Sequence, residues 1–325
     1  MSNSSNKRLQ LILENRKNQI NEELGAAYRQ KGYPINEVER KRTDSLINDL
    51  QVELQNIENE LSKLHKNINQ GDLQNNILQI DFNEAVEIIN KFINQSNNEK
   101  NAALFLIQNT AKNAGEKCVA RFREELRPKT RNFEHIPIRC LPSTTTKKAL
   151  LDLLAGYFGP PQNLEDLAYY AQTIIEKICD RVQTGSIMFI ELNCWSNLKP
   201  EEEILPWFIT NFWQPLLELS PSILTAKDCR RVRFIVMITS INNILVNFPV
   251  LNTYCIKDWN DFNKNKVFDL QLQQSWSKEE IENWLDSYSG LKGQEISNLA
   301  QTIYSATDGN PALICHQLIE EMLNL

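Results

Sequence analysis

The sequence predicts an α/β protein with a parallel sheet, preceded by a helical hairpin and followed by a short run of helices. Two observations predict the sheet: apolar segments such as residues 234–238 are continuous rather than alternating, and helical segments separate them. A heptad pattern in the first seventy residues predicts the hairpin. The chain has 325 residues, enough for two domains. We place them at residues 1–75 and 76–325, with a helical tail from about residue 275.

The first helix of the hairpin is predicted from apolar residues at helical spacing, and Gly-Tyr-Pro at residues 32–34 ends it. In the second helix apolar residues recur at alternating gaps of three and four, which makes an a/d heptad seam: Ile47, Leu50, Leu54, Ile57, Leu61, Leu64 and Ile68. A break is predicted at residues 69–72. The seam has two interpretations. Either it packs only on the first helix, or it is a coiled-coil surface for a protein partner, an effector or a second copy.

Helices and strands are predicted to alternate through the α/β part. A helix at residues 82–93 leads into strands at 102–108, 135–140, 186–191, 233–239 and 267–272. Further helices are predicted at 117–126, 148–158, 164–182 and 200–219. Ser277 and Glu280 have the spacing of a capping box, and Trp276 and Ile281 take the hydrophobic-staple positions, so the helical tail begins there.

Charge and hydropathy exclude several classes of protein. The net charge of −6 gives no support for a general nucleic-acid or membrane-surface binder, since both prefer a basic face. Acidic residues dilute the locally basic segment from Arg121 to Lys148. No apolar run approaches a membrane span, and the first residues lead into a charged helix rather than a signal peptide. We therefore expect a cytoplasmic protein with no membrane partner and no nucleic-acid partner.

The cysteines and histidines do not have the spacing of a metal site. The seven cysteines include no C-x-x-C pair, and the three histidines are far apart in the sequence. We expect most of the thiols to be reduced and buried, and we expect no metal ion.

The loop after the first predicted strand lies where a phosphate-binding P-loop would begin, at residues 107–118. If Lys117 is the phosphate-binding lysine of G-x-x-x-x-G-K-[ST], Ala111 replaces the first glycine and Glu116 the second. Cys118 then replaces the hydroxyl that binds magnesium, and a thiol is a poor magnesium ligand.

A second alignment of this loop takes Gly115 as the second glycine. Thr110 then replaces the first glycine and Glu116 replaces the lysine. Both alignments put a carboxylate where a polyphosphate would lie. Glycine is scarce throughout the chain, with 10 residues in 325. Residues other than glycine pay about 1–2 kcal/mol for left-handed backbone, so a loop without glycines is poorly suited to wrap a phosphate.

The ends of the third and fourth predicted strands lack the other groups that ATP hydrolysis requires. Glu191 ends the third strand, but Leu192 follows it where a second acid would activate water. After the fourth strand, Ile241 stands where an arginine would sense a γ-phosphate.

This order of motifs resembles the STAND class of signal-transduction P-loop NTPases over about residues 78–325. Residues 307–313, with Gly309 and Pro311, are similar to the G-x-P motif that packs near the nucleotide base in that class. Because the groups for hydrolysis are missing, the chain is most similar to the inactive STAND group of bacterial, often cyanobacterial, conflict and signalling systems.

The resemblance implies a fold, a site and a role. The fold is a P-loop NTPase-like three-layer αβα sandwich, and a short N-terminal module recruits an effector or partner. The vestigial nucleotide site would comprise Gly115, Lys117, Cys118, Glu191, Gly309 and Pro311.

The role that we expect is a non-catalytic scaffold with no cofactor. The first alternative is a weak ATP-binding switch that keeps its affinity through Lys117 and the G-x-P segment. The second alternative is a nucleic-acid-binding coiled-coil protein.

Overall fold

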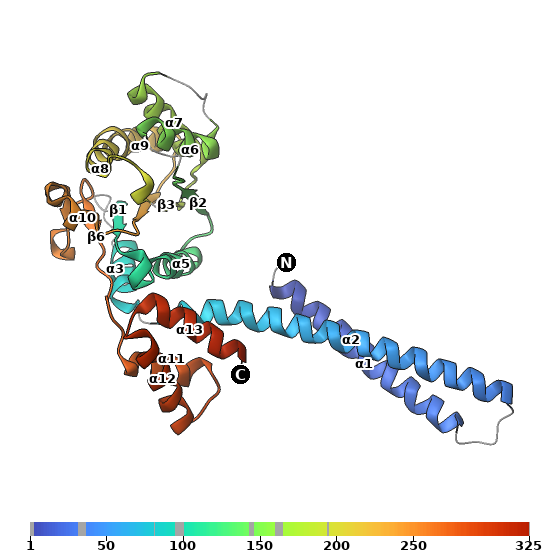
Figure 1. The fold of residues 1–325 in the computed structure, drawn as a ribbon. Coiled ribbons are helices and arrows are strands. Elements are labelled where there is room, and N and C mark those ends of the chain that lie inside the picture. The colour runs from blue at the N-terminus through green and yellow to red at the C-terminus, as the bar shows by residue number, and fades with distance from the viewer. Residues whose placement is uncertain are drawn as a thin grey trace. The chain divides into compact units, whose positions relative to one another are not determined.

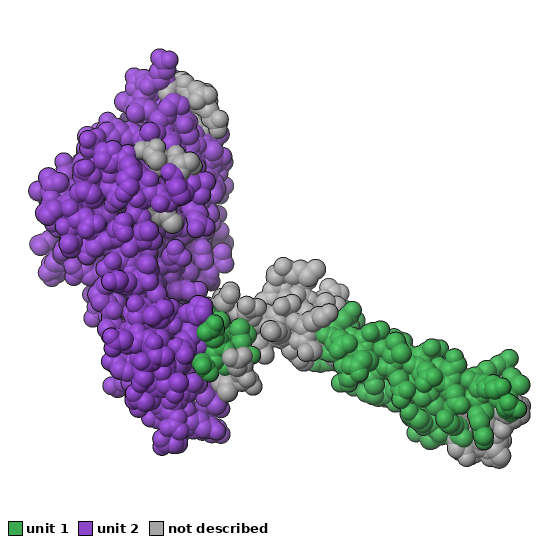
Figure 2. Space-filling model, in the orientation of Figure 1, with its two compact units in different colours: residues 1–77, 318–325 green, residues 78–317 purple. Residues whose placement is uncertain are grey.

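The computed structural model describes residues 3–31, 37–80, 82–94, 101–142, 146–159, 165–193 and 195–324. The chain divides into two compact units (Figure 1), which Figure 2 colours separately. Unit 1 comprises residues 1–77 and 318–325, and unit 2 comprises residues 78–317.

Unit 1 contains a hairpin of two long helices, α1 (Asn3–Lys31) and α2 (Glu37–Ile77). The helices run antiparallel, because Arg16 pairs with Glu53 at 2.8 Å and Lys31 with Asp44 at 2.6 Å. Their shared core consists of Ile20, Leu24, Ala27, Ile47, Leu50 and Ile57, with Leu13 and Leu54 packed against it. The seam residues Ile47, Leu50, Leu54 and Ile57 therefore pack inside the hairpin. The side chains of Leu61, Leu64 and Ile68, and the turn at residues 32–34, lie outside the described residues.

The break predicted at residues 69–72 is wrong, because α2 continues without interruption to Ile77. A single glycine within a helix costs only about 1 kcal/mol relative to alanine. Leu73 and Ile77 are buried one helical turn apart beyond Gly71, and their burial offsets that cost.

Unit 2 is built on a six-stranded sheet in which every pair of neighbouring strands is parallel. The strand order is β2-β3-β4-β1-β6-β5. The strands are β1 (Ala102–Ile107), β2 (Phe133–Arg139), β3 (Ile187–Asn193), β4 (Arg233–Thr239), β5 (Cys255–Ile256) and β6 (Val267–Asp269). The α/β class with a parallel sheet is confirmed. The sequence missed β5, since a two-residue edge strand has no measurable periodicity.

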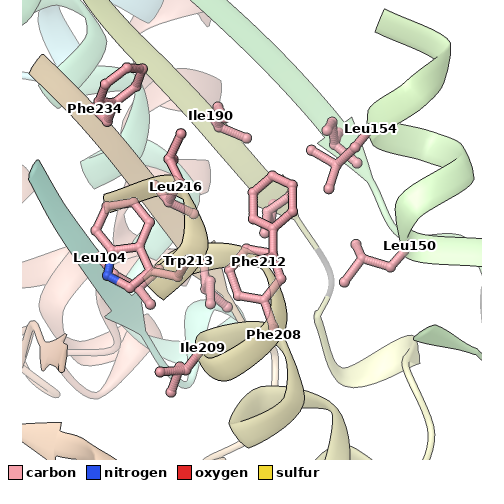
Figure 3. Packing of buried hydrophobic residues seen from close by; sticks show 14 of the residues in the cluster. Leu104, Leu150, Leu154, Ile190, Phe208, Ile209, Phe212, Trp213, Leu216 and Phe234 are labelled. Atoms are coloured by element: carbon pink, nitrogen blue, oxygen red, sulfur yellow. The ribbon is translucent and has the colours of Figure 1, made fainter. Parts of the chain in front are cut away.

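One face of the sheet packs against α6 (Lys147–Phe158), α7 (Leu167–Arg181), α8 (Glu201–Phe208) and α9 (Gln214–Ala226). Figure 3 shows Phe208, Phe212 and Trp213 of this layer within the same buried cluster as Leu104, Ile190 and Phe234 of the sheet. The helix predicted at 200–219 is interrupted by a π-helical segment, Ile209–Trp213. Pro215 follows this segment at the start of α9 and has no N–H to donate to the preceding turn.

The other face of the sheet is covered by α3 (Asn83–Asn94) and α5 (Gly115–Leu126). Phe92 of α3 meets Phe105 of β1 edge to face, with the ring centroids 6.2 Å apart. Residues 110–113 form a short helix, α4 (Thr110–Asn113), just before α5. The first strand thus ends in a loop that leads directly into the helix covering this face.

Helices α11 (Lys278–Tyr288), α12 (Gln294–Thr307) and α13 (Pro311–Asn324) follow the sheet. Between β4 and β5 lies a short helix, α10 (Ile244–Asn247). The predicted capping box is confirmed at the start of α11, where Ser277 and Glu280 bond reciprocally. The staple residues Trp276 and Ile281 are both buried.

Candidate functional site

The loop between β1 and α5, residues 108–115, is compact and carries two residues with left-handed backbone. Asn109 has a φ of 60° and Ala114 has a φ of 54°. Neither is a glycine, and left-handed geometry is less favourable for alanine than for asparagine. Between them, α4 makes one helical turn. Residues 110–113 therefore fold back on themselves instead of forming an open loop.

The loop satisfies its own polar groups through Asn113, which is 2% exposed. The Asn113 Oδ1 atom accepts a hydrogen bond from the Gly115 N–H at 3.1 Å, and its Nδ2 donates to the Gln108 carbonyl at 2.7 Å. The Thr110 N–H donates to the Ser240 carbonyl at 3.1 Å. In a P-loop such amides bind phosphate oxygens. Here an asparagine oxygen is the acceptor for the first amide of α5.

Gly115 is required by close packing rather than by backbone conformation. A Cβ atom at this position would lie 2.6 Å from Thr110 Cγ2 and 2.8 Å from Ile107 Cγ2. Its φ lies outside the left-handed region. The one glycine that the sequence offers to this loop therefore has a steric role.

Lys117 and Cys118 lie in different environments although they are adjacent. Lys117 lines a cavity of about 270 Å³, which we call the Lys117 cavity, together with Thr110, Ala111, Ala114, Glu116, Ile241, Ala312 and Cys315. Cys118 is fully buried, and burial raises the pKa of its thiol far above the ordinary value. Its thiol stays protonated in the core, which disfavours metal binding.

Glu191 is held within the sheet by neighbouring strands. Its Oε2 atom lies 2.6 Å from His135 Nε2 of β2, and its Oε1 accepts from Asn193 Nδ2 at 2.7 Å. Asn193 Oδ1 in turn accepts from the Thr239 hydroxyl of β4 at 2.9 Å. Burial raises the pKa of Glu191, but the hydrogen bonds from His135 and Asn193 and the charge of Arg123 outweigh it and leave the pKa lowered.

Gly309 and Pro311 form the turn that opens α13. Gly309 has a φ of 72°, and a Cβ there would lie 2.4 Å from Ser275 Oγ and 2.9 Å from the Trp276 carbonyl. The Gly309 carbonyl accepts the Trp276 N–H at 2.8 Å. Pro311 is the first residue of α13, where its missing N–H costs nothing.

Of the six predicted site residues, Lys117 lines the Lys117 cavity and the other five do not. The structure nevertheless brings the two predicted segments together, because Ala312 and Cys315 of α13 face the same cavity. The sequence analysis missed these two residues. Their only signal is the helical spacing after Pro311. Burial raises the pKa of Cys315 to about 12, and the nearby Lys117 acts in the opposite direction.

Two arginines of the basic segment, one on α5 and one just after it, pair with glutamates of α5. Arg121 lies 2.7 Å from Glu125, and Arg127 lies 3.7 Å from Glu124. In the part of the chain that the structure describes, no group of three or more His, Cys, Asp or Glu residues is placed to hold a metal ion. Nor does any helix among the described ranges have the length and apolarity to cross a bilayer.

Comparison with known proteins gives one family match. The family model described as inactive STAND matches residues 77–240. No curated protein matches the sequence.

Several solved structures are similar at low identity. One is the Aeropyrum pernix ORC1 protein in complex with DNA, at 10% identity and a TM-score of 0.44, with 74% of this chain and 58% of that chain covered. Another is the Aeropyrum pernix ORC2 protein, also at 10% identity and a TM-score of 0.44, with 74% of this chain and 67% of that chain covered. A third is Saccharomyces cerevisiae RIF2, at 12% identity and a TM-score of 0.36, with coverages of 81% and 94%. The chain thus spans less than two thirds of the ORC1 structure.

Proposed function

The chain belongs to the inactive STAND family, and from this premise we propose that it is a non-catalytic scaffold or adaptor of a prokaryotic conflict or signalling system. In this proposal the α/β unit is a rigid support. The hairpin of α1 and α2 binds an effector or another protein partner.

The observation that carries the proposal is the closed loop between β1 and α5. The Gly115 N–H already bonds to Asn113 Oδ1 at 3.1 Å, and Asn113 is 2% exposed. A phosphate would have to displace a buried side chain that already bonds through both Oδ1 and Nδ2, and it would approach beside the carboxylate of Glu116. Leaving buried polar groups without partners costs about 1–3 kcal/mol each. These features support a protein that does not turn over ATP.

The binding surface that we assign to the hairpin is the part of α2 that is not buried against α1. Ile47, Leu50 and Ile57 are buried against α1, so this part of the seam is already in use. Leu46 and Val52 of α2 remain 47% and 62% exposed. Exposed aliphatic side chains on a long helix are suitable contacts for a partner helix.

The test is affinity capture with the tagged full-length chain. We expect the double variant Leu46→Glu, Val52→Glu to lose the captured partner while its helical circular-dichroism signal is unchanged. The matched control carries the same new charges on exposed polar positions of α2, as Gln55→Glu with Asn59→Glu, and should keep the partner. Capture that survives the first variant would contradict the proposed surface.

A second candidate function, a weak ATP-binding switch, is favoured by one observation. Lys117 is half-buried and lines an open cavity of about 270 Å³, and no ion pair joins it to a carboxylate in the described part of the chain. If the protein is such a switch, partner capture will depend on Mg-ATP and will be abolished by Lys117→Ala. If it is a scaffold, neither the addition of Mg-ATP nor the Lys117→Ala substitution will affect partner capture.

A further inference from the structure

A larger cavity, of about 510 Å³, lies at the carboxyl ends of β1, β4 and β6 and has no part in the proposed scaffold function. We call it the amide cavity, because seven of its thirteen lining residues are asparagine or glutamine. In open parallel sheets this edge is where ligands bind. Its volume is within the range for small-molecule sites.

The two ionisable residues among those that line the amide cavity are Lys257 and Asp269. Lys257 Nζ lies 3.8 Å from Asp269 Oδ2, which is beyond hydrogen-bonding distance. The Asp269 side chain is 4% exposed, whereas that of Lys257 is 53% exposed. A hydrogen-bond acceptor and a hydrogen-bond donor thus lie side by side in the lining of the cavity, without a direct hydrogen bond between them.

The carboxylate of Asp269 is held in place by Gln108. Gln108 Nε2 donates to Asp269 Oδ1 at 2.9 Å, and Gln108 Oε1 accepts the Leu245 N–H at 2.9 Å. Both ends of this amide are therefore fixed by the fold. A pre-positioned acceptor reduces the ordering cost of binding a ligand.

The geometry points to a ligand that presents a ring N–H beside a ring C=O, and we propose that the amide cavity binds a neutral cyclic lactam of the oxopurine class. The N–H would donate to Asp269 and the carbonyl would accept from Lys257. The carboxamide side chains that also line the cavity can each donate or accept a hydrogen bond. Leu245 and Leu272, both largely buried, offer apolar surface to the faces of a planar ring.

Two other ligand classes fit the lining less well. The charges of Lys257 and Asp269 cancel, so a phosphate would find no net positive field. A sugar usually stacks its apolar face on an aromatic ring, and none of the thirteen lining residues is aromatic.

The test is isothermal titration of the full chain with guanosine, inosine, 1-methylguanosine and adenosine. We expect saturable binding of guanosine and inosine. Binding of the two compounds that lack an N1–H should be weaker by about tenfold or more, because the Asp269 carboxylate then loses its donor. Equal binding of guanosine and 1-methylguanosine, or no binding of guanosine at millimolar concentration, would overturn the proposal.

Two variants assign the binding to this cavity. Lys257→Met removes the donor from a half-exposed position and should weaken guanosine binding by about tenfold or more without unfolding the protein. Asp269→Asn should do the same. Its matched control, Asp286→Asn on an exposed part of α11, should bind like the wild type. Guanosine binding unaffected by Lys257→Met would contradict the proposed site. ATP lacks an N1–H and is not a ligand that we expect in this cavity. ATP binding that depends on Lys117 would therefore contradict the scaffold function and leave the proposal for the amide cavity unaffected.

Discussion

The hairpin and the α/β unit bury their apolar residues in different ways. The hairpin has a single seam between two helices, and aliphatic side chains such as Val52 stay exposed on its outside. In the α/β unit the central strands β1, β3 and β4 are buried on both faces, and β1 is buried at every residue. A one-sided core leaves surface available for a partner, whereas a two-sided core uses its apolar residues internally. This difference is why we assign partner binding to the hairpin and support to the sheet.

The largest expected effect is in the core of the α/β unit. Trp213 is fully buried, and its Nε1 donates to the Lys264 carbonyl at 2.7 Å. Trp213→Ala should lower the free energy of unfolding by about 3–5 kcal/mol, because it leaves a cavity that helices on both sides cannot fill. Denaturant titration followed by tryptophan fluorescence would measure it. A loss below about 1 kcal/mol would show that this layer is loosely packed.

A smaller effect is expected in the seam of the hairpin. Leu50 is 5% exposed, but it has neighbours from only one other helix, so the helices can close around a smaller side chain. Leu50→Ala should destabilise the hairpin by about 2 kcal/mol. Amide hydrogen exchange of α1 and α2 would measure it, with Leu46→Ala at the exposed neighbouring position as the control. Equal effects at the two positions would contradict an internal seam.

The acid stability of the sheet should depend on Glu191. Its pKa is lowered in the folded protein, so its contribution is complete above the unfolded value of about 4.3 and is lost as the pH falls through the lower folded value. Glu191→Gln should cost about 1–3 kcal/mol at pH 7, with the difference from wild type shrinking towards pH 3. Thermal unfolding across this pH range measures it. A difference that grows on acidification would contradict a lowered pKa.

The smallest effect is expected from the ion pairs on the outside of the hairpin. Arg16 and Glu53 lie 2.8 Å apart, but their side chains are 38% and 43% exposed. A double-mutant cycle with Arg16→Ala and Glu53→Ala should give a coupling of about 0–1 kcal/mol that falls with added salt. A coupling well above that range would mean that charges rather than the seam hold the two helices together.

The sequence predicted what depends on periodicity and failed where long-range contacts decide. Continuous apolar strands and the Ser277 capping box predicted the sheet and the start of α11 correctly. Gly71 suggested a break, but α2 continues through it, and Leu73 and Ile77 are buried beyond it. The role of Asn113 was not predictable, because it depends on where its side chain points. The pairing of Lys257 with Asp269 brings together residues of two different strand ends, and no local motif signals it.

The most direct test of the central claim, that the loop between β1 and α5 does not bind the phosphates of ATP, is titration of the full chain with Mg-ATP. The Asn113–Gly115 hydrogen bond and the carboxylate of Glu116 predict no saturable heat. Saturable binding that Lys117→Ala abolishes would contradict the claim and would make the protein an ATP-dependent switch.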